Sequence, residues 1–104
     1  MTLRGKQKRY LRSQAHHLRP LFQVGKEGVS ISWLNQIREA IEKRELIKIN
    51  MLQNASVDTN EVRVFIESNS SIQVVQVIGH TLVLYQAATD VENRDISDKV
   101  NLLA

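Results

Sequence analysis

Segments with the periodicity of helices alternate with segments of strand character along most of this chain, and the last two segments are both strands. Gly79 and His80 separate these two, and a glycine first in a two-residue loop suits a type II′ hairpin. Strands that alternate with helices and end in a hairpin predict a small α/β sandwich, in which a mixed sheet of four strands packs against helices. The predicted order is α-β-α-β-α-β-β, with helices over residues 3–18, 31–43 and 59–69 and strands over residues 21–24, 46–51, 72–78 and 81–85.

Residues that favour helix starts precede each helical segment, namely Thr2, Ser30 and Asp58. Asp58 with Glu61 forms the spacing of a capping box, which favours a helix after it. The apolar residues within 62–66 also alternate and are mostly β-branched, which suits a strand. This third segment therefore has two interpretations, of which the helix is preferred.

The length of 104 residues suits one domain, because independent cores usually need roughly 100 to 200 residues each. The absence of cysteine excludes disulfides, zinc ribbons and thiol nucleophiles. The longest uninterrupted apolar run, Leu82–Tyr85, is far below the roughly 18 residues of a membrane span. Residues 1–10 precede no apolar block of signal-peptide length, so we expect a cytoplasmic protein.

The chain becomes acidic and poor in apolar residues near its end. We therefore divide it into a domain over residues 1–88 and an acidic C-terminal tail over residues 89–104. The tail is expected to be either disordered or a short helix, which Thr89 and Glu92 would cap.

The positive charge is concentrated in the first half of the chain. Residues 1–50 contain 11 Lys and Arg against four Asp and Glu, whereas residues 51–104 contain three against seven. The first 26 residues hold seven bases and no acid. On the first helix Lys8, Arg12 and His16 form a row opposite the apolar side. Such a local field is typical of a protein that binds a polyanion.

The loop Gly25-Lys26-Glu27-Gly28 lies between a predicted strand and the start of a helix. Free backbone N–H groups and the helix dipole favour an anion at such a place, and glycines let a phosphate approach closely. Lys26 would add positive charge, whereas Glu27 opposes it. Glycines required only by a turn explain the same spacing. The basic first 26 residues favour a nucleic-acid surface, formed by the loop next to the first helix.

Simpler interpretations of these features stay open. The first helix also fits a solvated basic face without a partner, or weak docking on an anionic membrane. Trp33 fits packing at the edge of the second helix better than base stacking. Glu39, Glu42 and Glu45 fit a solvated helix face.

The sequence contains no arrangement of residues that is typical of a catalytic site. His16, His17 and His80 have no third ligand at metal spacing, and no nucleotide-binding fingerprint occurs. We therefore predict a binding module rather than an enzyme, with no catalytic residues, no metal and no cofactor.

Five segments, in this order and spacing, resemble the bacterial YhbY-like proteins, which are stand-alone CRM domains named for chloroplast RNA splicing and ribosome maturation. The resemblance covers about residues 2–86. The segments are Leu18–Pro20, Val24–Ser30, Ile37–Ile41, Glu45–Ile49 and Val75–Tyr85.

The resemblance implies a fold similar to the C-terminal domain of translation initiation factor three, with a CRM-type RNA-binding domain over residues 1–88. It implies non-enzymatic association with ribosomal RNA of large-subunit precursors during ribosome assembly. We expect a monomer that has no small-molecule substrate and no membrane partner. His80 and Gln86 stand where relatives often have basic residues, which puts a basic contribution there in doubt. The implied RNA contacts are the loop residues Gly25, Lys26, Glu27 and Gly28 and a basic surface of Arg4, Lys6, Lys8, Arg9, Arg12 and Arg19.

Three other functions remain as alternatives to RNA binding. A protein-interaction adaptor would use the acidic tail and a sheet edge. A metal-dependent nuclease would use His16 or His17. A duplex DNA-binding protein would need a helix-turn-helix spacing, and none is apparent in the sequence.

Overall fold

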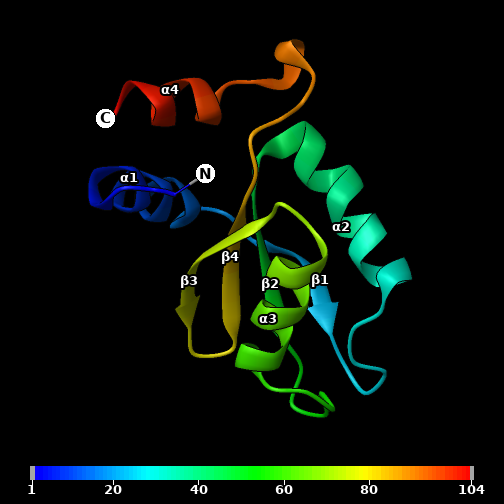
Figure 1. Ribbon diagram of the computed structural model, residues 1–104. Coiled ribbons are helices and arrows are strands. Elements are labelled where there is room, and N and C mark those ends of the chain that lie inside the picture. Colours follow the sequence, from blue (N-terminus) through cyan, green and yellow to red (C-terminus); the bar gives the residue numbers. More distant parts are fainter. Residues whose placement is uncertain (1, 104) are drawn as a thin grey trace.

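The structure is a computed structural model that describes residues 2–103, and its sheet has helices on both faces (Figure 1). The predicted order of the first seven elements and the small α/β class are confirmed. Within residues 2–103, every helix is too short or too polar to span a bilayer. The elements are α1 (Gly5–Ala15), β1 (Pro20–Val24), α2 (Ile31–Arg44), β2 (Leu46–Met51), α3 (Thr59–Asn69), β3 (Gln73–Ile78), β4 (Thr81–Tyr85), the 3-10 helix η1 (Val91–Asn93) and α4 (Ile96–Leu102).

The four strands form one mixed sheet in the order β1-β2-β4-β3. β1 and β2 are parallel, and α2 provides the crossover that a parallel pair requires. The other two pairs are antiparallel. The hairpin between β3 and β4 is confirmed, because Ile78 pairs with Thr81 and Gly79 has a φ of 56°, which glycine adopts without strain.

β2 lies inside the sheet and contributes to a hydrophobic core on each face. Ile47 and Ile49 lie in the core beneath α2 and α3. Leu46 lies in the core on the other face, together with Leu11 of α1 and Val100 of α4. The molecule therefore has three layers, with α2 and α3 on one face of the sheet and α1 and α4 on the other.

The ambiguous third segment is a helix, and its cap explains why. The Asp58 carboxylate accepts the Glu61 N–H at 2.7 Å, and the Glu61 carboxylate accepts the Asp58 N–H at 3.3 Å. Val62 and Ile66, one turn apart, are buried, whereas Val64 is 52% exposed. The capping box thus selects a helical period over the alternating one.

α1 differs from its predicted bounds at both ends. It begins after Arg4, so Thr2 is not its cap. The buried Gln7 fixes this start, because its side chain accepts the Arg4 N–H at 2.7 Å and donates to the Val100 carbonyl at 3.0 Å. The helix ends at Ala15, and Leu18 lies beyond it.

Glu45 is buried rather than solvated, which corrects the sequence-based interpretation of this residue. It follows α2 with a φ of 65°, and its carboxylate accepts the N–H groups of Ala88 at 2.7 Å, Asp95 at 2.9 Å and Ser97 at 3.1 Å. Burial raises the pKa of Glu45, but the amide hydrogen bonds outweigh that effect, so its pKa lies below the ordinary value.

Glu42 makes a second set of contacts with the segment after β4. Its carboxylate accepts the Thr89 N–H at 2.8 Å, the Thr89 hydroxyl at 2.9 Å and the Asp90 N–H at 3.0 Å. Because the Thr89 hydroxyl bonds to Glu42, it does not cap a helix; Asp90 caps η1 by accepting the Glu92 N–H at 2.9 Å. The two glutamates hold η1 and the start of α4 against the end of α2.

We expect Glu45→Gln to lower the free energy of unfolding by about 2 kcal/mol at neutral pH, because one accepting oxygen becomes an NH2 group and the remaining hydrogen bonds lose their charged acceptor. A carboxyl group whose pKa is lowered by folding stabilises the fold above its unfolded pKa, ordinarily 4.5, and this stabilisation is lost as the pH falls below it. Urea unfolding of both proteins should therefore show a difference that shrinks below this pH. The exposed Glu39→Gln serves as the control. A difference that does not vary with pH would contradict this role.

Candidate nucleic-acid interface

The predicted glycine loop is a tight turn between β1 and α2. The Gly28 N–H donates to the Gly25 carbonyl at 3.0 Å, which closes a four-residue β-turn. Lys26 and Glu27 occupy the central positions with exposed side chains. We call residues Gly25–Gly28 the glycine turn.

The two glycines have different structural roles. Gly28 has a φ of 71°, and a Cβ on it would lie 2.9 Å from the Ser56 hydroxyl oxygen. Gly25 has no positive φ, and a Cβ there would lie 3.3 Å from a methyl group of Leu52. The backbone conformation therefore requires glycine at position 28 but not at position 25.

The glycine turn leads directly into the first turn of α2. The Ser30 hydroxyl accepts the Trp33 N–H at 3.1 Å, so Ser30 is the N-cap that the sequence predicts. The Trp33 indole N–H donates to the Gln23 carbonyl at 3.3 Å, and its ring packs against the core. Trp33 thus braces the start of α2 against β1, and the positive end of the helix dipole lies next to the turn.

A shallow hollow of about 310 Å³ lies between the loop after β2 and the hairpin of β3 and β4. Leu52 and Val57, which face the two glycines, line it together with His80. The sequence interpretation did not include this hollow, because its walls come from the loop after β2 and from the hairpin. His80 is exposed at this end of the sheet, where the sequence left a basic contribution in doubt.

The bases predicted for the other half of the surface are all exposed. Arg12 also donates to the Val75 carbonyl at 3.4 Å, which holds it over β3. Among the residues that the structure describes, the one ion pair joins Lys99 to Asp95, so these bases have no carboxylate partner there. Five of them belong to α1 and its N-cap, and we call these the basic helix face: Arg4, Lys6, Lys8, Arg9 and Arg12. Arg19, the sixth, lies beyond α1 and just before β1.

The glycine turn and α1 do not lie next to each other as the sequence interpretation expected. α1 packs on the sheet face opposite α2, because its apolar residues belong to the second core. The glycine turn follows the far end of β1 (Figure 1). A direct cradle between the two is therefore wrong, and any ligand that contacts both must also cross the sheet surface between them.

Lys48 lies on that intervening surface, and the sequence interpretation did not assign it a role. With Arg12, His16, Gln76 and Ile78 it lines a depression of about 120 Å³. The alternation of β2 already placed Lys48 opposite Ile47 and Ile49. What the sequence did not reveal is that α1 leaves this part of the face uncovered.

Polar residues continue from this depression toward the glycine turn. Asn50, two residues after Lys48, pairs with Gln23 of β1, and Gln23 is two residues before Gly25. Gln23 is exposed, and Lys48 and Asn50 are half-buried. We call Gln23, Lys48, Asn50 and Gln76 the bare sheet region.

The histidines form no metal centre in the part of the chain that is described. The rings of His16 and His17 lie edge to face at 5.2 Å, and His80 lies at the far hairpin. Within residues 2–103, no group of three or more His, Asp or Glu is arranged to hold a metal ion.

Comparison with known sequences gives one family and several relatives. The model of the family described as the CRS1 / YhbY (CRM) domain matches residues 3–86. A Bacillus subtilis relative named "Probable RNA-binding protein YqeI" is 53% identical over 94 residues, which cover 90% of this chain and 96% of the relative. A Haemophilus influenzae relative named "RNA-binding protein" is 35% identical over 91 residues, which cover 86% and 90%.

Comparison with solved structures supports the same fold. The solution structure of a hypothetical protein from Staphylococcus aureus matches with a TM-score of 0.71 and 40% sequence identity. The match covers 90% of this chain and 98% of that one.

The glycine turn yields a prediction about stability. We expect Gly28→Ala to lower the free energy of unfolding by more than about 1 kcal/mol, because the positive φ strains alanine and its Cβ meets Ser56. Gly25→Ala should cost less, because the close methyl belongs to the partly exposed Leu52 side chain, which can move. Chemical denaturation followed by circular dichroism measures both losses. Equal losses, or a larger loss at Gly25, would refute the assignment.

Proposed function

The chain belongs to the CRS1 / YhbY (CRM) domain family, and from this premise we propose that it is a non-enzymatic, monomeric RNA-binding protein of the cytoplasm. Its RNA is ribosomal RNA of large-subunit precursors, and its role is to assist their assembly. Residues 1–88 form the RNA-binding domain, and the segment after it contributes Ile96 and Val100 to the second core. The names of the two relatives support RNA as the partner.

The observation that carries this proposal is exposed positive charge without carboxylate partners among the described residues. Neither the lysine at the apex of the turn nor the bases of the helix form an ion pair with a carboxylate of the described residues. RNA phosphates are the ligands that such an arrangement suits, since neutralising them releases condensed counterions.

One part of the proposed interface is the glycine turn. A phosphate binds at the backbone N–H groups of the turn and of the first residues of α2, where the helix dipole favours negative charge. Lys26 supplies a positive charge from the exposed apex. The absence of a side chain at Gly25 keeps the backbone accessible, although the fold does not require glycine there.

The other part is the basic helix face, reached across the bare sheet region. An RNA strand that leaves the glycine turn passes Gln23, then Lys48, and reaches Arg12 and His16 at the depression. Contacts of this kind position the backbone without reading bases, so selectivity comes from the shape of the RNA.

Charge reversal at the turn tests the first part. We expect Lys26→Glu to weaken binding of a ribosomal RNA fragment, measured by fluorescence anisotropy, and to make the salt dependence shallower. For about four neutralised phosphates the wild-type slope of log affinity against log salt should be about −3. Lys43→Glu, at the exposed far end of α2, is the matched control and should bind nearly as the wild type. Equal affinities of Lys26→Glu and wild type would remove the turn from the interface.

The identity of the RNA is tested in cells. Ultraviolet crosslinking of the full chain, followed by sequencing of the attached RNA, should enrich large-subunit ribosomal RNA and its precursors over messenger and small-subunit RNA. The Lys26→Glu protein should lose most of that enrichment at equal abundance. Enrichment of another RNA class would refute the assembly role while leaving RNA binding intact.

A further inference from the structure

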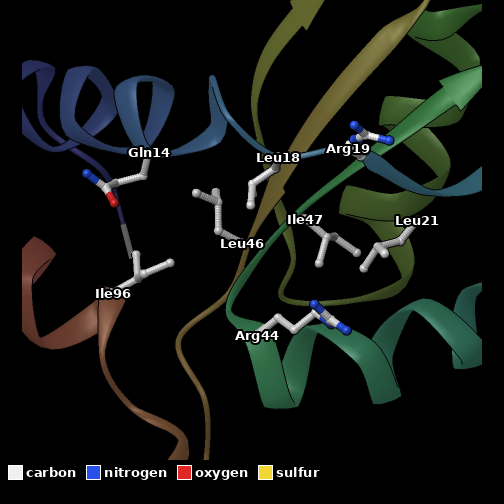
Figure 2. Close-up of a pocket in the computed structure, with 8 residues that line it drawn as sticks. All are labelled: Gln14, Leu18, Arg19, Leu21, Arg44, Leu46, Ile47 and Ile96. Carbon is white, nitrogen blue, oxygen red and sulfur yellow. The ribbon is translucent and has the colours of Figure 1, made fainter.

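Figure 2 shows a hollow of about 460 Å³ near the start of β1, whereas the glycine turn follows the other end of that strand. Five elements border it: α1, β1, the end of α2, the start of β2 and the start of α4. Its floor and walls are aliphatic, formed by Leu18, Leu21, Leu46, Ile47 and Ile96. Leu18 and Leu21 remain 38% and 44% exposed, so an apolar surface at the sheet edge faces water.

The walls of this hollow are held in place before any ligand binds. Ile96 stands between Asp95 and Ser97, and both of their N–H groups donate to the buried Glu45 carboxylate. Arg44 and Leu46, which also line the hollow, are the chain neighbours of Glu45. Glu45 thus ties the start of α4 to the end of α2, which reduces the ordering needed on binding.

The charged groups that line the hollow are both arginines. Figure 2 shows Arg19 and Arg44 from different elements, with Leu21 and Ile47 lying between them. Both arginines are exposed, and no carboxylate lines the hollow. The surface therefore combines an aliphatic floor with two cationic rims, each able to bind a carboxylate through paired N–H donors.

This lining fits a protein better than a nucleotide. Bases bind proteins by stacking on aromatic rings and by hydrogen bonds to their edges, but no aromatic side chain lines this hollow. Gln14 supplies its one uncharged polar side chain. Protein interfaces instead have an apolar centre and are enriched in arginine.

We propose that this hollow docks a partner protein through a segment in which aliphatic side chains are flanked by carboxylates. The aliphatic side chains fill the space between Leu21, Ile47 and Ile96, and the carboxylates pair with Arg19 and Arg44. The site is separate from the glycine turn, and Ile96 lies outside residues 3–86 that match the family. One protein could therefore hold RNA at one end and a protein segment at the other.

The test uses the full chain labelled with ¹⁵N and a capped synthetic peptide in which Leu alternates with Asp and Glu. The peptide should shift the amide signals of Leu18, Leu21, Arg44 and Ile96. Arg44→Glu should weaken the peptide about tenfold, because the reversal removes an arginine–carboxylate pair and places a like charge against the acids of the peptide. Lys43→Glu, which carries the same charge change on the adjacent residue outside the hollow, should weaken it less than about twofold.

Two further arms decide between occupants. A peptide with Lys in place of its acids should bind Arg44→Glu better than wild type, and Leu21→Gln should weaken the acidic peptide with the charges unchanged.

Equal losses in Arg44→Glu and Lys43→Glu would overturn the proposal, because they indicate only bulk charge. Oligoribonucleotides that shift the hollow's signals in place of the peptide, or a dimer in sedimentation that buries Leu21, would overturn it as well. Arg44→Glu and Lys43→Glu should bind ribosomal RNA equally, so failure here is distinct from failure of RNA binding.

Discussion

The two-sided burial of β2 is the constraint on which the rest of this structure depends. Its odd and even residues face different layers, so Ile47 and Ile49 anchor α2 and α3 while Leu46 anchors α1 and α4. On the second face the strand changes from apolar Leu46 to polar Lys48 and Asn50. α1 covers the apolar part, and the polar part stays partly open. The half-buried positive charge of Lys48 on the open part of the sheet follows from this single change along one strand.

Glu45 connects this sheet to the end of the chain. A carboxylate that is 1% exposed is stable only with strong donors, and here three backbone amides from residues 88, 95 and 97 supply them. Residues beyond the family match thereby complete the second core, where Val100 packs with Leu11. Removing them would leave a buried charge without partners. The α4 segment is therefore part of the body of this protein in structural terms.

Local signals in the sequence predicted most of the fold. The capping box at Asp58 and the alternation of β2 gave bounds that agree with the structure, since both depend on neighbouring residues alone. The start of α1 depends on Gln7 reaching Val100, 93 positions away, and the burial of Glu45 depends on donors of residues 88–97. Contacts between residues so far apart in the chain produce no periodic pattern in the sequence. For the candidate site, the sequence identified the glycine turn and the exposed bases. It did not show that the sheet separates them, because that depends on which face of the sheet α1 covers, and composition does not encode this.

We propose that one RNA contacts both the glycine turn and the basic helix face by crossing the bare sheet region. A titration of the ¹⁵N-labelled full chain with a large-subunit ribosomal RNA fragment tests it most directly. We expect shifted amide signals at Lys26, at Ser32 in the first turn of α2, at Lys48 and Gln76, and at Arg12, with the exposed side of α3 near Val64 unchanged. Shifts at the glycine turn with none at Lys48 and Arg12, or shifts centred on α3, would contradict it.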